Sequence, residues 1–291
     1  MGAPVAAHLV NAGHDLRVFD LFPAAVEPVV AAGATAAASA AEAAVGAACV
    51  FLSLPAPGDV EAAVSGPGGV LDAEPRPERI VDLSTNSPAM VARLQQRCAE
   101  VGVGFLDAPV SGGRAKAQTG ELSVLVGAGD DDFAAVEPLL ECFAGEVFHV
   151  GPPGMGTVAK LVNNQLFLAA GELVQEAYVL GAAAGLEPSV LHRIIKASSA
   201  GPYAALAPLL LGRRFDDVIF RLDIAAKDLT LAVEAAGAYG VEVPATAAAL
   251  SVYRDALEAG MGNEVFHATL KHLERAAGIE LPALTRTPRP S

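Results

Sequence analysis

The chain has 291 residues, enough for two domains of ordinary size that each bury a core. Hydrophobic residues make up 53% of it and charged residues 18%, a composition typical of a well-packed protein. The formal net charge of −14 argues against nucleic acid as a partner, because phosphates need clustered Lys and Arg, and against anionic membrane surfaces. The three cysteines lack paired or metal-ligand spacing, and no N-terminal signal is evident. We therefore expect reduced thiols, no metal site and a cytoplasmic location.

The first half of the chain alternates short β-rich runs with helical patterns, which predicts βαβ units around a parallel sheet. A helix is expected over residues 5–11, with Gly13 after its end. Ser39 and Glu42 predict a capping box, and Ser87 followed by Pro88 predicts another helix start. Strands are expected over residues 16–19, 49–54, 79–83, 103–107, 122–126 and 147–150.

After Gly151 every periodic segment predicts a helix, over residues 157–184, 188–197, 221–239, 244–259 and 264–276. The most apolar stretch, residues 161–186, carries Asn, Gln and Glu side chains that would be costly in hydrocarbon, so we expect a buried core helix there. The sequence thus predicts a doubly wound, Rossmann-type α/β domain over residues 1–150 and an all-α helical domain over residues 151–291.

The start of the chain carries part of a dinucleotide-binding pattern. In G-x-G-x-x-G the third glycine opens the first helix, and an acidic residue about 20 positions on binds the ribose hydroxyls. Gly2 and Asp20 match these two positions, although an Asp that ends a strand is also a common turn residue. The first strand and the first two glycines do not precede Gly2. Either the natural start lies about ten residues upstream, which we favour, or the chain has abandoned cofactor binding.

A second group of residues lies where the helical half begins. Gly151, Gly154 and Gly156 precede Lys160, and Asn164 follows one helical turn later on the same face. Apolar residues in the next turns indicate that this face is covered, and partial desolvation would lower the pKa of Lys160 so that it exchanges a proton near neutrality. Asn164 would then orient a substrate hydroxyl; the alternative is an asparagine that caps or bridges.

A third group follows a predicted strand that ends at Asp107. Ser111, Gly112 and Gly113 enter a helical turn, and the glycine pair lets backbone amides approach a ligand closely. Such an arrangement suits a carboxylate, and the alternative is a simple tight turn.

Together these motifs resemble the β-hydroxyacid dehydrogenase family, which includes 3-hydroxyisobutyrate dehydrogenase, tartronate semialdehyde reductase and L-threonate dehydrogenase. The resemblance covers essentially the whole chain. It rests on the order of five runs, at residues 54–55, 81–85, 107–113, 151–164 and 227–229.

The resemblance implies an NAD-dependent oxidoreductase that interconverts a small 3-hydroxy acid and its aldehyde or ketone by hydride transfer. Lys160 would be the acid–base residue, and Asn164 would bind substrate together with Ser111, Gly112 and Gly113. The implied cofactor-binding residues are Gly2, Asp20, Leu54, Pro55, Thr85 and Lys227. The helical domain would contribute to the substrate site and build a homodimer or homotetramer.

NAD is expected in preference to NADP, because the Asp20 carboxylate would repel a 2′-phosphate. Arg17 is the nearby cation that would weaken this argument. Two positions depart from the family pattern. Asn86 stands where many members carry an apolar residue. Lys116 follows the Ser-Gly-Gly turn as in the sugar-acid branch, where it either binds an extra substrate oxygen or faces solvent.

Three alternative functions remain open for this chain: a threonate-like sugar-acid dehydrogenase, an imine or semialdehyde reductase, and a non-catalytic homologue. Imine reductases of this architecture usually replace the catalytic lysine, so Lys160 disfavours them, and Lys160 with Asn164 also disfavours the non-catalytic homologue.

Overall fold

The computed structural model describes residues 1–284, and the chain divides into two compact units. The first unit is Met1–Leu161 and the second begins at Val162, so the division falls inside the long helix α8 (Met155–Ala183). The last strand, β8 (Ala144–Gly151), ends where a helical domain was predicted to begin. The other elements of the first unit are β1 (Arg17–Val18), β2 (Thr35–Ala36), β3 (Cys49–Leu52), β4 (Arg79–Asp82), β5 (Gly104–Asp107), β6 (Val110–Ser111), β7 (Leu122–Gly127), α1 (Gly2–Asn11), α2 (Pro23–Ala31), α3 (Ala40–Ala44), α4 (Pro57–Ser65), the 3-10 turn η1 (Val70–Asp72), α5 (Pro88–Ala99), α6 (Gly113–Thr119) and α7 (Asp130–Leu140).

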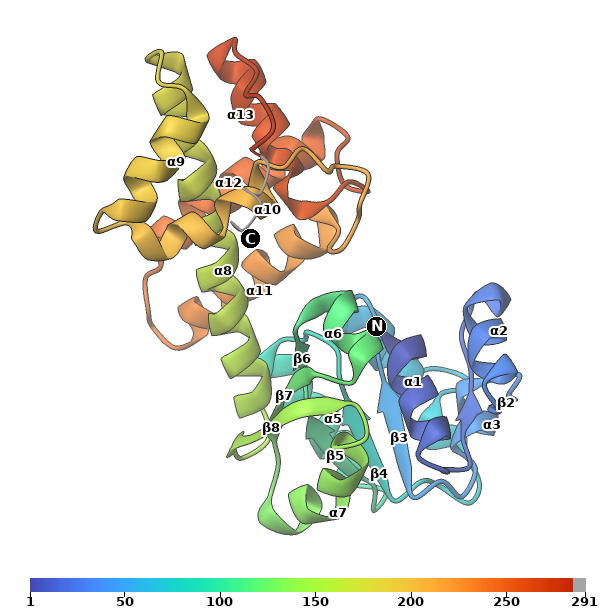
Figure 1. Ribbon diagram of the computed structural model, residues 1–291. Helices are drawn as coiled ribbons and strands as arrows, with labels where there is room; N and C mark the ends of the chain where they lie inside the picture. The colour runs from blue at the N-terminus through green and yellow to red at the C-terminus, as the bar shows by residue number, and fades with distance from the viewer. Residues whose placement is uncertain (285–291) are drawn as a thin grey trace. The chain divides into compact units, whose positions relative to one another are not determined.

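The main sheet of the first unit has the strand order β3-β4-β5-β7-β6, with β8 paired to β7 (Figure 1). Strands β3, β4 and β5 are parallel and in register, so that Leu52, Asp82 and Asp107 lie side by side at the carboxyl ends of the three strands. β1 and β2 pair with each other in a separate two-stranded sheet. In open α/β sheets ligands bind beyond the carboxyl edge, which is therefore where the site is built.

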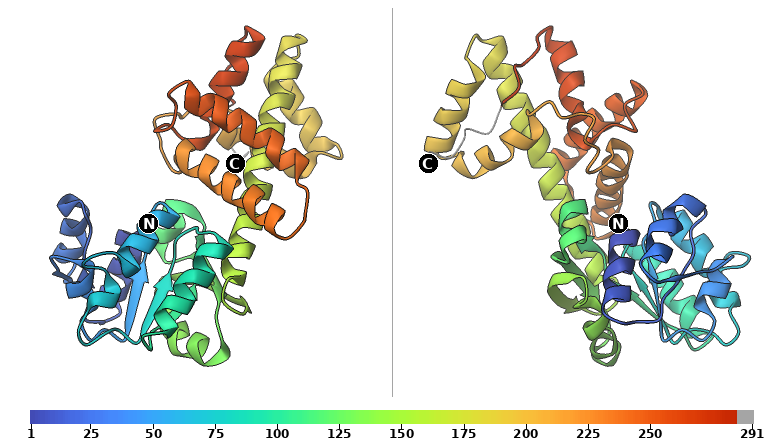
Figure 2. Two further views of the ribbon diagram at one scale, coloured as in Figure 1. Left: turned by 180° about the vertical axis from the view of Figure 1, so that it is seen from behind. Right: turned by 45° about the vertical axis from the view of Figure 1, so that its right-hand side comes forward.

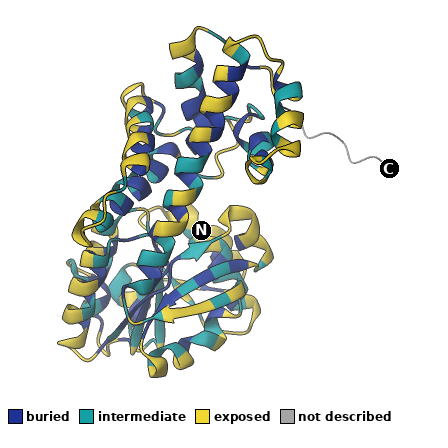
Figure 3. Ribbon diagram, turned by 90° about the vertical axis from the view of Figure 1, so that its left-hand side faces the viewer, coloured by how far each residue is buried: buried dark blue, intermediate teal, exposed yellow. Residues whose placement is uncertain are grey.

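Helices cover both faces of this sheet. Neighbouring residues of one strand enter different hydrophobic cores, as Ile80 and Val81 of β4 do, because successive side chains point to opposite faces. One core includes residues of α1, α6 and α7, and the other includes residues of α3, α4 and α5. The turned views and the burial colouring show this layering (Figures 2 and 3). The predicted doubly wound α/β fold is confirmed.

Local sequence signals account for several helix starts. The Ser39 hydroxyl accepts from the Glu42 amide at 3.0 Å, as the predicted capping box requires, and the Ser87 hydroxyl accepts from the Met90 amide at 3.2 Å. Helices α2, α4 and α7 were not predicted, and α6 was expected only as a helical turn. They are short or contain an internal proline, so their apolar periodicity is weak.

The second unit is helical, as predicted. Its core is formed by buried residues of α8, α10, α11, α12 and the segment that leads into α13, with Tyr178, Tyr253 and Phe266 among the largest wholly buried side chains. The predicted helix over 264–276 begins later than expected, because Val265 pairs with Arg221 in an isolated bridge before the chain turns. The elements after α8 are α9 (Pro188–Ala197), η2 (Gly201–Ala205), α10 (Ala207–Leu210), α11 (Leu222–Ala238), α12 (Pro244–Glu258), η3 (Phe266–Ala268) and α13 (Thr269–Ala277).

Among the described residues, α8 is the helix that is long and apolar enough to cross a membrane on length and composition alone. Within the chain, 44% of its most apolar window is buried. Glu172 and Gln175 lie on its buried face and hydrogen-bond to Thr269 at 2.8 and 3.1 Å. These properties match those of a core helix that packs through one face.

Candidate active site

The site is assembled first from the loops that follow β3 and β4. The Asp82 carboxylate, which is 1% exposed, accepts from the Ser84 amide at 3.0 Å and from the Asn86 side chain at 3.2 Å. The Ser84 hydroxyl then accepts from the Leu54 amide at 2.9 Å. Asp82 therefore ties together the loops that carry Leu54 and Thr85, two predicted cofactor residues. Asn86, singled out as a departure from the family, is wholly buried and serves this network.

The start of α1 reaches the same edge. A Cβ atom built on Gly2 would lie 3.3 Å from the Ser53 Cβ, next to Leu54, so α1 packs closely against the chain that leaves β3. No side chain caps the amino terminus of α1, so its first amide groups are not used by a capping side chain. An uncapped helix start of this kind suits a phosphate group.

Asp107 connects the end of β5 to the beginning of α8. Its carboxylate is 1% exposed; one oxygen accepts from the Gly154 amide and the other from the Thr157 amide, both at 2.6 Å. Burial raises the pKa of Asp107, and the two amide hydrogen bonds oppose that rise. Because Thr157 lies one turn before Lys160, the clamp fixes the helical turn that carries Lys160. It also fixes the strand end from which the chain continues to Ser111.

Two glycines make this clamp possible. A Cβ on Gly156 would press on the backbone of Leu125 and lie 2.7 Å from the Asp107 carbonyl oxygen. A Cβ on Gly127 would overlap the Asp107 carboxylate and lie 2.8 Å from the Gly156 amide nitrogen. Only hydrogen leaves enough room at both positions for α8 to start against β5 and β7.

The predicted carboxylate-binding segment, residues 111–113, lies between β6 and α6. Gly112 and Gly113 have φ angles of +123° and +71°, which L side chains rarely adopt. Ser111 is half-buried, whereas both glycines are exposed. The consecutive positive φ angles explain why the pair must be glycine.

Lys160 is half-buried on α8, and Asn164 is 6% exposed one turn further on. The Asn164 amide nitrogen donates to the Asp228 carboxylate of α11 at 2.7 Å, and its oxygen accepts from the Asn163 side chain at 3.2 Å. Lys227 pairs with the same aspartate, with 2.9 Å between Nζ and Oδ1. Asp228 therefore joins two predicted site residues, Asn164 and Lys227, within the second unit.

Asp20 stands apart from these networks. It follows β1, is exposed, and its carboxylate accepts from the Phe22 amide at 2.8 Å within its own turn. The Arg17 guanidinium donates to the backbone carbonyls of Glu42 and Val45 at the end of α3. The Arg17 guanidinium therefore hydrogen-bonds to backbone carbonyls of its own domain.

The first unit brings Gly2, Leu54, Pro55 and Thr85 to one sheet edge and connects the 111–113 segment with Lys160 through Asp107. Three buried aspartates that make these connections, Asp82, Asp107 and Asp228, were not among the predicted site residues. One sequence signal could have indicated Asp82 and Asp107, since each is an aspartate at the end of a strongly apolar strand. In that position a buried carboxylate must find donors from neighbouring loops.

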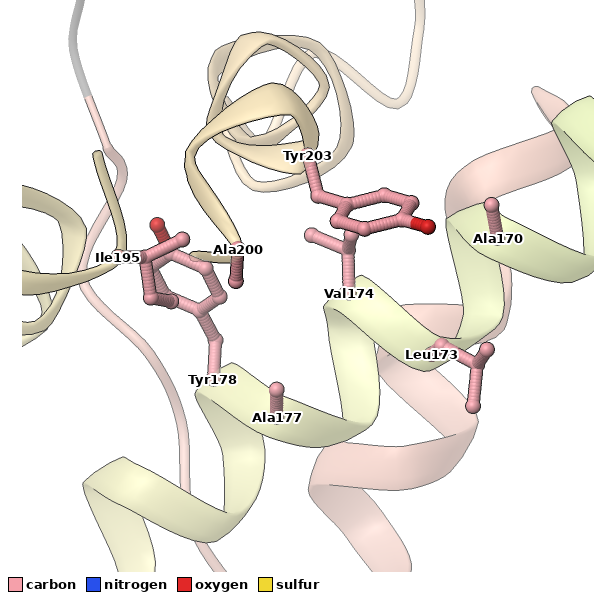
Figure 4. A pocket seen from close by; sticks show the side chains of 8 residues that line it. All are labelled: Ala170, Leu173, Val174, Ala177, Tyr178, Ile195, Ala200 and Tyr203. Atoms are coloured by element: carbon pink, nitrogen blue, oxygen red, sulfur yellow. The ribbon is translucent and has the colours of Figure 1, made fainter. Parts of the chain in front are cut away.

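An apolar cavity lies elsewhere, within the second unit. It has a volume of about 270 Å³ and lies between α8, α9 and η2 (Figure 4). Its walls are side chains of Ala, Leu, Val, Ile and Tyr, and Figure 4 shows the Tyr203 ring above Val174. Without a charged group this cavity does not suit a hydroxy acid.

Comparison with known proteins identifies the family. The NAD binding domain of 6-phosphogluconate dehydrogenase matches residues 1–151, and the NAD-binding domain of NADP-dependent 3-hydroxyisobutyrate dehydrogenase matches residues 154–273. The chain belongs to the β-hydroxyacid dehydrogenase family. It is thus an enzyme of the NAD(P)-dependent 3-hydroxyacid dehydrogenases, as the sequence motifs implied.

Relatives within the β-hydroxyacid dehydrogenases cover nearly the whole chain. A 2-(hydroxymethyl)glutarate dehydrogenase from Eubacterium barkeri is 37% identical over 97% of this chain and 94% of its own. An NAD-dependent L-serine dehydrogenase from Pseudomonas aeruginosa is 38% identical over 96% of both chains. The solved structure of 3-hydroxyisobutyrate dehydrogenase from Mycobacterium tuberculosis with L-serine is 30% identical, has a TM-score of 0.82, and is matched over 94% of this chain and 95% of its own.

Proposed function

We propose that the protein is an NAD-dependent dehydrogenase of small 3-hydroxy acids, with Lys160 as the acid–base residue. The observation that carries the proposal is the Asp107 clamp. It holds the first turns of α8, and with them Lys160, against the strand end that leads to residues 111–113. Proton transfer and substrate anchoring need such a fixed relation between two groups.

The residues at the carboxyl edge fit a dinucleotide. The uncapped start of α1 at Gly2 suits the pyrophosphate, and Leu54, Pro55 and Thr85 lie on the loops that Asp82 ties together. Lys227, oriented by Asp228 in the second unit, is proposed as a further contact to the cofactor. When bound, the nicotinamide supplies the hydride chemistry.

The preference for NAD rests on charge. The exposed Asp20 carboxylate would accept from the ribose hydroxyls and repel a 2′-phosphate. Arg17, the cation that would favour NADP, donates to the carbonyls of α3 instead.

The proposed reaction uses three groups of this chain. The Ser111 hydroxyl and the amides of Gly112 and Gly113 hold the substrate carboxylate. Lys160 takes the proton from the substrate hydroxyl as the alcohol is oxidised, and returns one in the opposite direction. Asn164, whose amide nitrogen donates one hydrogen to Asp228, offers its second amide hydrogen to the substrate hydroxyl oxygen.

An oligomer of identical chains stays a prediction. One face of α8 carries Val162, Leu166, Leu173 and Leu180, whose exposed fractions lie between 58% and 72%. A line of large apolar side chains on one helix favours burial against another copy. Light scattering during size-exclusion chromatography should give the mass of a dimer or tetramer, and the mass of a single chain would contradict the expectation.

The proposed activity is tested with the purified full chain, NAD or NADP, and 3-hydroxyisobutyrate, L-serine, 2-(hydroxymethyl)glutarate and L-threonate. We expect NADH formation with at least one of these acids. L-threonate as the best substrate would favour the sugar-acid alternative. No turnover of any hydroxy acid by a protein that binds NAD would refute the proposal.

A further inference from the structure

Lys116 lies directly against the 111–113 segment. A Cβ atom built on Gly112 would stand 2.7 Å from the Lys116 Cδ, 2.9 Å from its Cβ and 3.3 Å from its Cγ. The aliphatic part of Lys116 therefore occupies the space above Gly112 that any other residue would fill. Gly112 is needed for this packing as well as for its positive φ.

This packing limits where the ammonium group can be. Nζ lies two bonds beyond Cδ, so it stays within about 2.5 Å of that atom. It is consequently within about 5 Å of the point where a Gly112 side chain would begin. A lysine whose stem is held in this way loses much of the freedom that normally makes a surface lysine a weak ligand.

The charge of this region differs from that of the whole chain. The net charge is −14, yet Arg114 and Lys116 place two exposed cations within three residues of the 111–113 segment. Within residues 1–284 neither of them forms a salt bridge with a carboxylate. They therefore present positive charge to an incoming anion.

We propose that Lys116 is a specificity-determining residue that binds a second anionic group of the substrate, so that hydroxy acids with two acidic groups are preferred over those with one. The inference rests on the proposed function, because it places the first carboxylate on residues 111–113. That carboxylate is held by neutral donors, namely the Ser111 hydroxyl and two amides. The Lys116 charge is then available for a further acidic group of the same molecule.

The test compares two substrates in four proteins. The substrates are 3-hydroxyisobutyrate, with one acidic group, and 2-(hydroxymethyl)glutarate, with two. The variants are Lys116→Met, which keeps an unbranched stem over Gly112 without the charge, Lys116→Arg, which keeps a cation, and Lys196→Met, which removes an exposed lysine from α9. Melting temperatures establish that each variant is folded.

We expect Lys116→Met to lower kcat/KM for 2-(hydroxymethyl)glutarate about tenfold or more while changing that for 3-hydroxyisobutyrate less than about twofold. Lys116→Arg should restore most of the loss, and Lys196→Met should resemble the unaltered enzyme. An equal fall with both substrates would mean that Lys116 binds the shared carboxylate, and no change would mean that it faces solvent; either result overturns the inference. Turnover of L-serine or L-threonate but of neither acid named here would also overturn the inference, whereas failure with all four acids would instead refute the proposed function.

Discussion

Glu172 gives the structure's clearest prediction about stability. Its carboxyl is 2% exposed, accepts from the Thr269 hydroxyl at 2.8 Å, and has Gln175 and Tyr253 beside it. Burial, helped by the nearby Glu176 and opposed by hydrogen bonds, raises the pKa of Glu172 from 4.5 to about 8. At neutral pH the folded protein therefore holds Glu172 protonated.

This protonation makes stability depend on pH. The unfolded chain releases the Glu172 proton above pH 4.5, whereas the folded chain keeps it until about pH 8. Between these pH values the unfolded state is stabilised relative to the folded state by about 1.4 kcal/mol per pH unit. The free energy of unfolding therefore falls by up to about 3 kcal/mol by pH 7 and by up to about 5 kcal/mol by pH 8. Above pH 8 the loss is complete and the curve levels.

Glu172→Gln removes this cost, because the amide oxygen still accepts from Thr269 and the amide nitrogen can donate to Tyr253. We expect the melting temperature of the variant to exceed that of the unaltered protein by an amount that grows from about pH 5 to about pH 8, reaching at least about 5 °C. Circular dichroism follows the loss of helix. Burial lowers the pKa of His267 to about 4, so this histidine destabilises both proteins as the pH falls below about 6.5. The difference in melting temperature between the two proteins removes this shared effect and is therefore the quantity to measure.

Glu234→Gln serves as the control, since it replaces an exposed glutamate on α11, away from Glu172. Its effect should stay within about 0.5 kcal/mol at every pH. If Glu172→Gln also shows no advantage that grows with pH, Glu172 is ionised in the folded protein and the reasoning from burial fails.

Three further predictions concern the first unit. Gly156→Ala should lower the free energy of unfolding by about 2 kcal/mol or more, because the added Cβ would meet backbone atoms. Gly58→Ala, which adds a Cβ in open space on α4, should leave thermal unfolding unchanged. Equal effects of the two substitutions would contradict the close packing around Asp107. Asp107→Ala should lower the melting temperature, because the first amides of α8 lose the carboxylate that accepts their hydrogen bonds. It should also lower kcat, because Lys160 loses its fixed position. An unaltered kcat would show that these hydrogen bonds do not serve catalysis. Asp20→Ala should reduce the ratio of kcat/KM for NAD to that for NADP about tenfold or more, and an unchanged ratio would show that Asp20 does not contact the ribose.

The secondary structure of the sheet was predictable because it depends on local patterns. Short apolar runs at residues 49–54, 79–83 and 103–107 predicted β3, β4 and β5, and the switch to longer periodic segments after Gly151 predicted the helical half. The family followed from motif order, and the comparisons confirm it. Both kinds of inference use residues that are close together in the chain.

The connections within the site were not predictable in this way. Asp107 binds amides that lie 47 and 50 residues later, and Asn164 binds Asp228 64 residues later. No local pattern reports such partners, so the three aspartates were overlooked as positioning groups. The sequence likewise left Lys116 between two interpretations, and its packing on Gly112 became apparent only from the three-dimensional structure.

The central claim, a hydroxy acid dehydrogenase that uses Lys160 as acid and base, is tested most directly by the turnover of Lys160→Ala. NAD affinity is measured by isothermal titration calorimetry, and kcat by NADH formation with the best hydroxy acid. We predict that kcat falls by about 10²–10⁴-fold or more while the Kd for NAD changes little, because the lysine acts on the substrate proton and not on cofactor binding. A variant that keeps most of its turnover would contradict the account, because the proton would then be transferred by another group.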